Sequence, residues 1–207
     1  MVSGLSYAGF IWTRVCTNVT PMSKARSKGT FAETAGVDYL SASGFPYAER
    51  IALGGAKDKG DVKVCPGVIA EFKNCATIKL PQWFREVTAE KANANAKHAF
   101  LVVKPEGIGR TRVGQWWAGM LLGDLAELLV EAGGPPLVSD PVWLPGHRYL
   151  DVLGSRIKDL SALSVFGYVG IRPAGVEDLR YWYAMTQLEQ IVRLLRMAGY
   201  GNPEVLS

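Results

Sequence analysis

Residues 60–73, GDVKVCPGVIAEFK, carry the most informative pattern in the chain. Two short runs rich in apolar and β-branched residues flank Pro66-Gly67, and proline followed by glycine is typical of a type II turn. The stretch therefore predicts a β-hairpin. Side chains alternate across a strand, so Glu71 and Lys73 are expected on one face. The hairpin would bring Asp61, at the start of the first strand, close to Glu71.

This trio of two carboxylates and one ammonium suits the hydrolysis of phosphodiesters. Carboxylate oxygens can hold Mg²⁺, which keeps several waters and takes a phosphate oxygen, and Mn²⁺ can substitute for it. The metal lowers the pKa of a bound water, and a neighbouring ammonium can stabilise the charge that develops on phosphorus. We therefore interpret Asp61 and Glu71 as metal ligands and Lys73 as a catalytic residue. Asp58 is an alternative to Asp61, which is preferred because a strand pattern, residues 62–64, follows it directly.

Hydrophobic periodicity and chain-breaking residues predict helices and strands on both sides of the hairpin. Thr30 can cap a first helix, and Gly44 can end it in the left-handed conformation. The expected elements are a helix over 30–42, a strand over 47–53, a helix after Pro81, strands over 99–103 and 113–120, a helix over 123–131, a strand over 164–171 and a long helix over 176–198. No internal repeat is expected. The pattern predicts the α/β class, with a mixed β-sheet flanked by helices.

The arrangement Asp-x9-Glu-x-Lys on a hairpin, after a helix that bears a glutamate, resembles the PD-(D/E)xK nuclease superfamily. More narrowly, it is similar to the archaeal-type Holliday junction resolvases. The matching segments are Lys28-Gly29-Thr30-Phe31-Ala32-Glu33, Gly44-Phe45, Ala48-Glu49-Arg50, Gly54-Gly55-Ala56, the Asp61, Glu71 and Lys73 core, and Gly114-Gln115-Trp116-Trp117 followed by 122–129. Two positions depart from the family pattern: Gly60 stands where the motif has proline, and glycine stands around Gly54 and Gly55 where the family has serine.

The resemblance implies a restriction-endonuclease-like fold, a mixed β-sheet flanked by helices. It also implies a division of the chain. Residues 1–23 would form an N-terminal segment, residues 24–131 the nuclease core, and residues 132–207 a C-terminal α/β extension beyond what that core needs.

The resemblance also adds residues to the site. Glu33, on the first helix, would be a third acidic residue that binds the metal directly or through water. Thr30-x-x-Glu33 is equally the pattern of a capping box, in which the glutamate only satisfies a backbone amide. Glu49 is the alternative helper carboxylate. Contacts to DNA phosphates would come from Lys28, Arg50, Lys57 and Lys59.

The expected activity is Mg²⁺-dependent hydrolysis of DNA by an endonuclease that resolves Holliday junctions in recombination and repair. Resolvases of this kind act as homodimers, and a two-fold dimer would place two sites on the two symmetric strands of a junction. An apolar face on Trp116, Trp117 and the following helix would supply the contact. The alternatives are a nuclease of other specificity (exonuclease, nickase or restriction-type) and a non-catalytic module that binds branched or double-stranded DNA.

Charge and composition agree with a DNA-binding enzyme of the cytoplasm. The net charge of the 207 residues is +4, and the basic surplus lies between Lys24 and Arg112, which favours a polyanionic partner. The three cysteines form no CxxC pair, so free thiols in a reducing compartment are expected. Neither a secretory signal nor an apolar run long enough to span a membrane is visible. The two histidines, His98 and His147, show no catalytic spacing.

Overall fold

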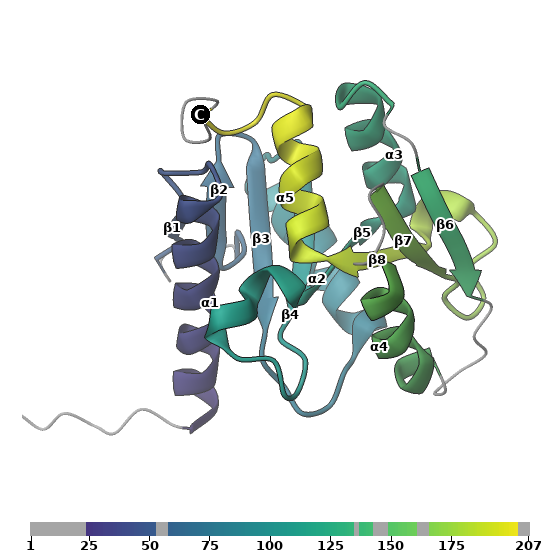
Figure 1. Ribbon diagram of the computed structural model, residues 1–207, viewed down its shortest axis with the longest axis horizontal. Coiled ribbons are helices and arrows are strands. Elements are labelled where there is room, and N and C mark those ends of the chain that lie inside the picture. The colour runs from purple at the N-terminus through teal and green to yellow at the C-terminus, as the bar shows by residue number, and fades with distance from the viewer. Residues whose placement is uncertain (1–23, 53–57, 135–136, 143–148, 161–165, 203–207) are drawn as a thin grey trace, which may run out of the picture.

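The computed structural model describes residues 24–52, 58–134, 137–142, 149–160 and 166–202. They form an eight-stranded mixed β-sheet with helices on both faces, in the order β1-β2-β3-β4-β5-β8-β7-β6 (Figure 1). The predicted α/β class is therefore confirmed. Within the described residues, every helix is too short or too polar to cross a membrane.

The elements follow the chain in this order: α1 (Lys24–Ala42), β1 (Glu49–Arg50), β2 (Val62–Cys65), β3 (Val68–Lys73), α2 (Leu80–Asn93), β4 (His98–Val103), the 3₁₀ helix η1 (Arg110–Gln115), β5 (Trp117–Leu121), α3 (Leu122–Glu131), β6 (Leu137–Val142), α4 (Tyr149–Leu160), β7 (Phe166–Ile171), the 3₁₀ helix η3 (Leu179–Tyr181), β8 (Tyr183–Gln187) and α5 (Leu188–Met197).

The predicted hairpin is present. β2 and β3 pair antiparallel, and Gly67 has a φ of 80°, the left-handed conformation that glycine adopts without strain. β1 pairs antiparallel with β2, and β3 runs parallel to β4, which it reaches through α2. The predicted strand over 47–53 is only two residues long. The first part of the chain thus has the order α-β-β-β-α-β.

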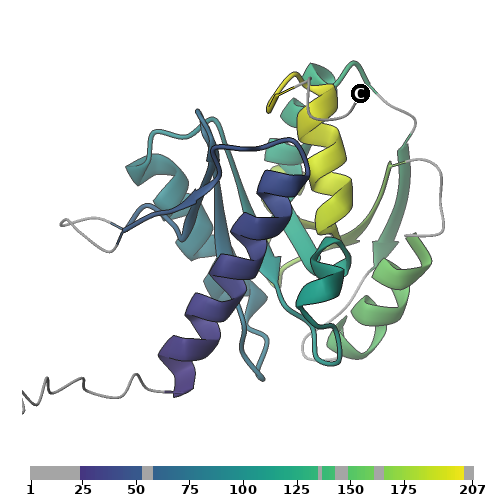
Figure 2. The ribbon, with the colours of Figure 1, turned by 60° about the vertical axis from the view of Figure 1, so that its left-hand side comes forward.

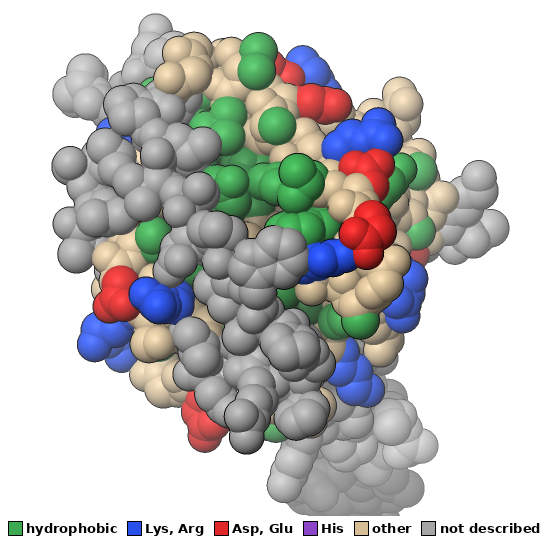
Figure 3. Space-filling view, turned by 90° about the vertical axis from the view of Figure 1, so that its right-hand side faces the viewer, with side chains coloured by type: hydrophobic (Ala, Val, Ile, Leu, Met, Phe, Trp, Pro, Cys, Tyr) green, Lys and Arg blue, Asp and Glu red, His purple; other side chains and the backbone are tan. Residues whose placement is uncertain are grey.

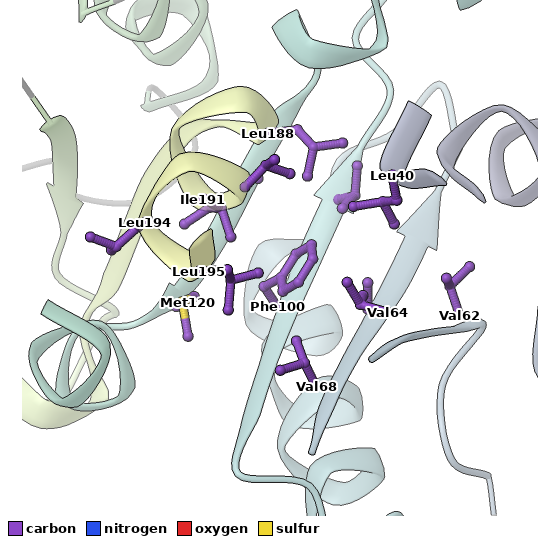
Figure 4. Close-up of a cluster of buried hydrophobic side chains, with 14 of the residues drawn as sticks. Leu40, Val62, Val64, Val68, Phe100, Met120, Leu188, Ile191, Leu194 and Leu195 are labelled. Atoms are coloured by element: carbon purple, nitrogen blue, oxygen red, sulfur yellow. The ribbon is translucent and has the colours of Figure 1, made fainter. Parts of the chain in front are cut away.

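Two hydrophobic cores lie on the two faces of the sheet. α1, α3 and α5 cover one face, and α2 and α4 cover the other (Figures 1 and 2). On the first face, Val64 and Phe100 from the strands meet Leu195 of α5 (Figure 4). On β3, Phe72 belongs to this core and Ile69 to the opposite one. This alternation determines which face receives the polar residues of β3.

The first helix begins at Lys24, six residues before the predicted start, so the prediction that Thr30 caps it is wrong. Thr30 lies inside the helix, where its carbonyl accepts a hydrogen bond from the Thr34 hydroxyl. The segment before it is rich in lysine, arginine and alanine, which are good helix formers. The predicted end is confirmed, because Gly44 has a φ of 100°.

Gly36 lets α1 approach the sheet closely. A Cβ atom at this position would lie 2.2 Å from Cζ of Phe72, whose ring is buried. We expect Gly36→Ala to lower the free energy of unfolding by about 1–3 kcal/mol, because overpacking outweighs the better helix propensity of alanine. Denaturant unfolding measures this. The matched control is Gly29→Ala in the same helix, whose Cβ would meet only Glu33 Oε1 at 3.4 Å. If Gly29→Ala were as unstable as Gly36→Ala, or less stable, the expectation would be contradicted.

The predicted long helix over 176–198 is wrong in its first half. Residues 179–181 form η3, Tyr183–Gln187 form β8, and α5 begins only at Leu188. β8 is buried along its whole length, because helices cover both faces of the sheet there, and such a strand shows no alternation of polar and apolar residues. Likewise, the predicted strand over 113–120 is η1 followed by β5.

The chain contains an internal structural repeat, contrary to the expectation from its sequence. The elements β3-α2-β4-η1-β5-α3 recur in the same order as β6-α4-β7-η3-β8-α5. In each half the first two strands are parallel and the third is antiparallel to the second. The two halves join through antiparallel β5 and β8, so one sheet runs through both.

This join covers the face predicted to hold two chains together. Trp116 is fully buried, β5 pairs with β8 of the same chain, and a Cβ on Gly154 of α4 would lie 3.2 Å from the Trp117 ring. Trp116 is therefore not available for the dimer contact predicted on Trp116, Trp117 and α3. The residues expected to receive a second subunit pack against the second half of the same chain.

Candidate active site

Asp61, Glu71 and Lys73 come together on the face of the sheet that α2 covers. The backbone N–H of Phe72 donates a hydrogen bond of 2.8 Å to Oδ2 of Asp61, which fixes this carboxylate across the hairpin. Nζ of Lys73 donates to Oε1 of Glu71 at 2.6 Å. The hairpin thus produces the predicted trio, with Glu71 buried and Lys73 mostly buried.

Helix α2 adds two glutamates that sequence reasoning missed. Oε2 of Glu86 lies 2.8 Å from Nζ of Lys73, so the ammonium is held between two carboxylates. Glu90, one turn further along α2, is only 4% exposed, and its Oε2 has no hydrogen-bond partner. A Cβ on Gly60, next to Asp61, would lie 3.6 Å from that oxygen. The i, i+4 spacing of Glu86 and Glu90 was a usable signal, but the face of the helix that meets β3 was not known.

Burial and mutual repulsion govern the charges of these acids. Burial, together with the negative charges of Asp61 and Glu90, raises the pKa of Glu71 from 4.5 to about 9, although Lys73 works in the other direction. Burial and the charge of Asp58 raise the pKa of Glu90 to about 7. Burial lowers the pKa of Lys73, but Glu71 and Glu86 more than offset this and keep it charged. The raised pKa of Glu71 means that burial and its acidic neighbours favour the protonated form of this carboxyl group, while Lys73 favours the ionised form.

Glu33 does not join this cluster. It lies on α1, on the other face of the sheet, and forms an ion pair with Arg50 of β1. Glu49, the alternative helper carboxylate, is exposed and pairs with Lys63 of β2 at 3.0 Å. On the α2 face, Glu90 occupies the place near Asp61 and Glu71 where a third carboxylate was expected.

The carboxylate oxygens of Asp61 and Glu71 are hard donors of the kind that Mg²⁺ prefers. The unpartnered oxygen of Glu90 is a further donor beside them. In the described part of the chain, however, no three Asp, Glu, His or Cys side chains are already arranged as a ligand set. The residue types fit a magnesium ion, and Oε1 of Glu71 accepts a hydrogen bond from the ammonium of Lys73.

The predicted phosphate-binding residues lie in two places around the hairpin, one at the end of β3 and one beside β2 and the start of β3. Lys28 is exposed on α1, and its carbonyl accepts a hydrogen bond from Asn74, directly after Lys73. Lys59 is exposed and lines a hollow of about 440 Å³ between the hairpin and the end of α2. Arg50, Lys63 and the acidic Glu49 line the same hollow, and both basic side chains form ion pairs, Arg50 with Glu33 and Lys63 with Glu49. This surface of three basic side chains and one acidic one is called the basic hollow. Lys57 lies outside the described residues.

The opposite end of the molecule has a different surface. Seen from the side of β6 and β7, hydrophobic side chains gather at the centre, with basic and acidic ones interspersed around them (Figure 3). His98 lies in the interior, where Nε2 is 3.1 Å from Glu131 Oε2, and Trp116 and Trp182 are buried and unable to stack on bases.

Comparison with known proteins adds no relative: no family model, no curated protein and no solved structure matches this chain.

Proposed function

We propose that this protein is a metal-dependent DNA endonuclease of the PD-(D/E)xK kind. The observation that carries the proposal is the convergence of Asp61, Glu71 and Lys73 on one face of a hairpin. The α-β-β-β-α-β order around that hairpin supports a restriction-endonuclease-like core. The basic hollow on the same hairpin, with Arg50, Lys59 and Lys63 among its lining residues, would be where the phosphate backbone of DNA binds.

The roles of the residues follow from their positions. Asp61 and Glu71 would hold the Mg²⁺, with Glu90 as a third carboxylate. When bound, the metal supplies Lewis-acid polarisation of the phosphate and a water of lowered pKa. Lys73, kept charged by Glu86, would stabilise the negative charge that grows on the phosphoryl oxygens. A cation binds the ionised form of Glu71, whereas burial favours the protonated form, so cation binding should release protons from this carboxyl group.

A second candidate, a DNA-binding module without catalysis, is favoured by one observation. Glu71 is buried and Lys73 is held by two carboxylates, which is also how a structural ion-pair network looks. On this view, the basic hollow would bind DNA and the trio would only hold the hairpin to α2.

Cleavage assays separate the two candidates. The protein is incubated with an end-labelled four-way junction and with a linear duplex of the same sequence, in Mg²⁺, in Mn²⁺ and in chelator. We expect cuts within the strands of the junction in either metal and none in chelator. Degradation from the ends of the linear duplex would indicate an exonuclease instead. Binding of both DNAs without cleavage in any metal would contradict the nuclease and support the module.

A further inference from the structure

We propose that the chain is a single-chain counterpart of a two-subunit nuclease, in which only the first half holds a complete site, so that each binding event nicks one DNA strand. This inference rests on the proposed nuclease function, because a nick presupposes cleavage of DNA. The two-fold arrangement of the halves, and the difference in the site residues that each half holds, follow from the fold alone.

The two halves are related by a pseudo-two-fold axis between β5 and β8. Gly119 pairs with Met185 at the centre of this strand pair. Trp117 pairs with Gln187 on one side, and Leu121 pairs with Tyr183 on the other, so each strand presents its start to the end of its partner. α3 follows β5 directly, and α5 follows β8 directly. Both helices cover the same face of the sheet.

The positions related by this axis include several that carry the same residue in both halves. At constant spacing, the pairs of identical residues are Trp116 and Trp182, Ala118 and Ala184, Leu122 and Leu188, Leu128 and Leu194, Leu129 and Leu195, Ala132 and Ala198, and Gly133 and Gly199. Most of these positions are buried, so they preserve the packing between the halves.

The strand register identifies which residues of the second half match the site. In the first half, Glu71 pairs with Leu101, and Leu101 pairs with Gly119. In the second half, Asp140 pairs with Val169, which in turn pairs with Met185, the partner of Gly119 across the axis. Asp140 therefore occupies the register position of Glu71.

By the same register, the position of Lys73 falls on Val142. Among the described elements, β2, which follows Asp61, has no counterpart either, because α3 ends at Glu131 and the next element is already β6, which begins at Leu137. Among the strands that the structure describes, β6 pairs only with β7. The second half thus matches one of the three groups, and Asp140 alone lacks the second carboxylate and the ammonium.

A symmetric dimer built through β5 would place the partner where β8 and α5 now lie. The second half of the same chain fills that place, so a single chain already has the two-fold arrangement. The number of sites falls from two to one, because, in the part of the chain that the structure describes, the second half has no counterpart of the hairpin or of α1. A Holliday junction would then be cut on one strand rather than on two.

The test combines molar mass with plasmid cleavage. Light scattering should give the mass of one chain, about 22.5 kDa, at concentrations used for cleavage. A supercoiled plasmid that extrudes a cruciform should accumulate as nicked circles before any linear product. Asp140→Asn, with folding checked by circular dichroism, should cleave at the wild-type rate, whereas Glu71→Gln should not cleave.

The outcomes separate this inference from the proposed function. A dimeric mass, linear plasmid as the first product, or an Asp140→Asn variant as inactive as Glu71→Gln would overturn the single-site arrangement while leaving the nuclease intact. A monomer that cleaves no DNA in any metal would overturn the proposed function and, with it, the nick, but not the single-chain two-fold fold.

Discussion

Glu71→Gln and Asp61→Asn should each abolish Mg²⁺-dependent cleavage while leaving the affinity for DNA within about twofold. Each change removes the negative oxygen of a hard ligand but keeps the shape of the side chain, so metal capture fails and the basic hollow remains. Lys73→Ala should lower the cleavage rate by about 10²–10³-fold, which is the usual cost of losing one group that stabilises transition-state charge. Single-turnover cleavage of the labelled junction and a binding titration in Ca²⁺ measure the two effects separately.

The matched control is Glu177→Gln. Glu177 is also a carboxylate in an ion pair, with Arg172, but it is exposed and lies in the second half of the chain. This variant should cleave at the wild-type rate. If Glu71→Gln retains normal activity, the assignment of the trio is wrong.

A second comparison distinguishes the two possible third carboxylates. The family resemblance points to Glu33, whereas the fold places Glu90 beside Asp61 and Glu71. Glu90→Gln should therefore reduce cleavage more strongly than Glu33→Gln, whose main loss is the ion pair with Arg50. The reverse order would restore Glu33 to the site and would require α1 to move relative to the hairpin.

Local signals predicted the hairpin well. Pro66-Gly67 specifies a turn by its own backbone preferences, and the spacing from Asp61 to Glu71 then follows from pairing of adjacent strands. Alternation along β3 placed Lys73 beside Glu71 without any knowledge of the rest of the chain. These features involve residues that are close in sequence.

Features that depend on distant pairing were missed. Tyr183–Gln187 looks helical in isolation and becomes a strand only because β5 lies beside it. Glu90 joins the site only because α2 packs its buried side against β3. The repeat escaped notice because the segments before the shared tryptophans differ in length and composition, and only the three-dimensional register aligns them.

The stability of the protein should fall as the pH rises from about 5 to 9, and Glu71 is the main cause. Burial, Asp61 and Glu90 raise its pKa to about 9 in the folded protein, whereas the unfolded chain releases this proton near 4.5. Between these values the folded state binds more protons, so the free energy of unfolding decreases with increasing pH. One such group contributes up to about 1.4 kcal/mol per pH unit. Glu90 acts in the same direction up to about pH 7.

Glu71→Gln should remove most of this slope, because a glutamine has no proton to lose. The variant should be more stable than the wild type at pH 8 by about 2 kcal/mol or more, and nearly equal to it at pH 5. Denaturant unfolding at pH 5, 6, 7 and 8 gives the comparison. Glu86 works with the opposite sign, since Lys73 lowers its pKa, but that contribution is lost only below about pH 4.5, outside this range.

The effect of Mg²⁺ on stability connects the pH dependence of unfolding to the proposed function. A cation that binds the deprotonated Glu71 stabilises the folded state by mass action, and more strongly at pH 8 than at pH 6. Addition of Mg²⁺ should therefore raise the melting temperature of the wild type at pH 8 and leave that of Glu71→Gln unchanged. If the stability of the wild type depended on neither pH nor Mg²⁺, Glu71 would be ionised and paired with Lys73, as in a structural ion pair. A variant that loses activity but gains stability is characteristic of a functional site. The stability and the cleavage rate of Glu71→Gln, measured together, therefore separate a catalytic role from a structural one.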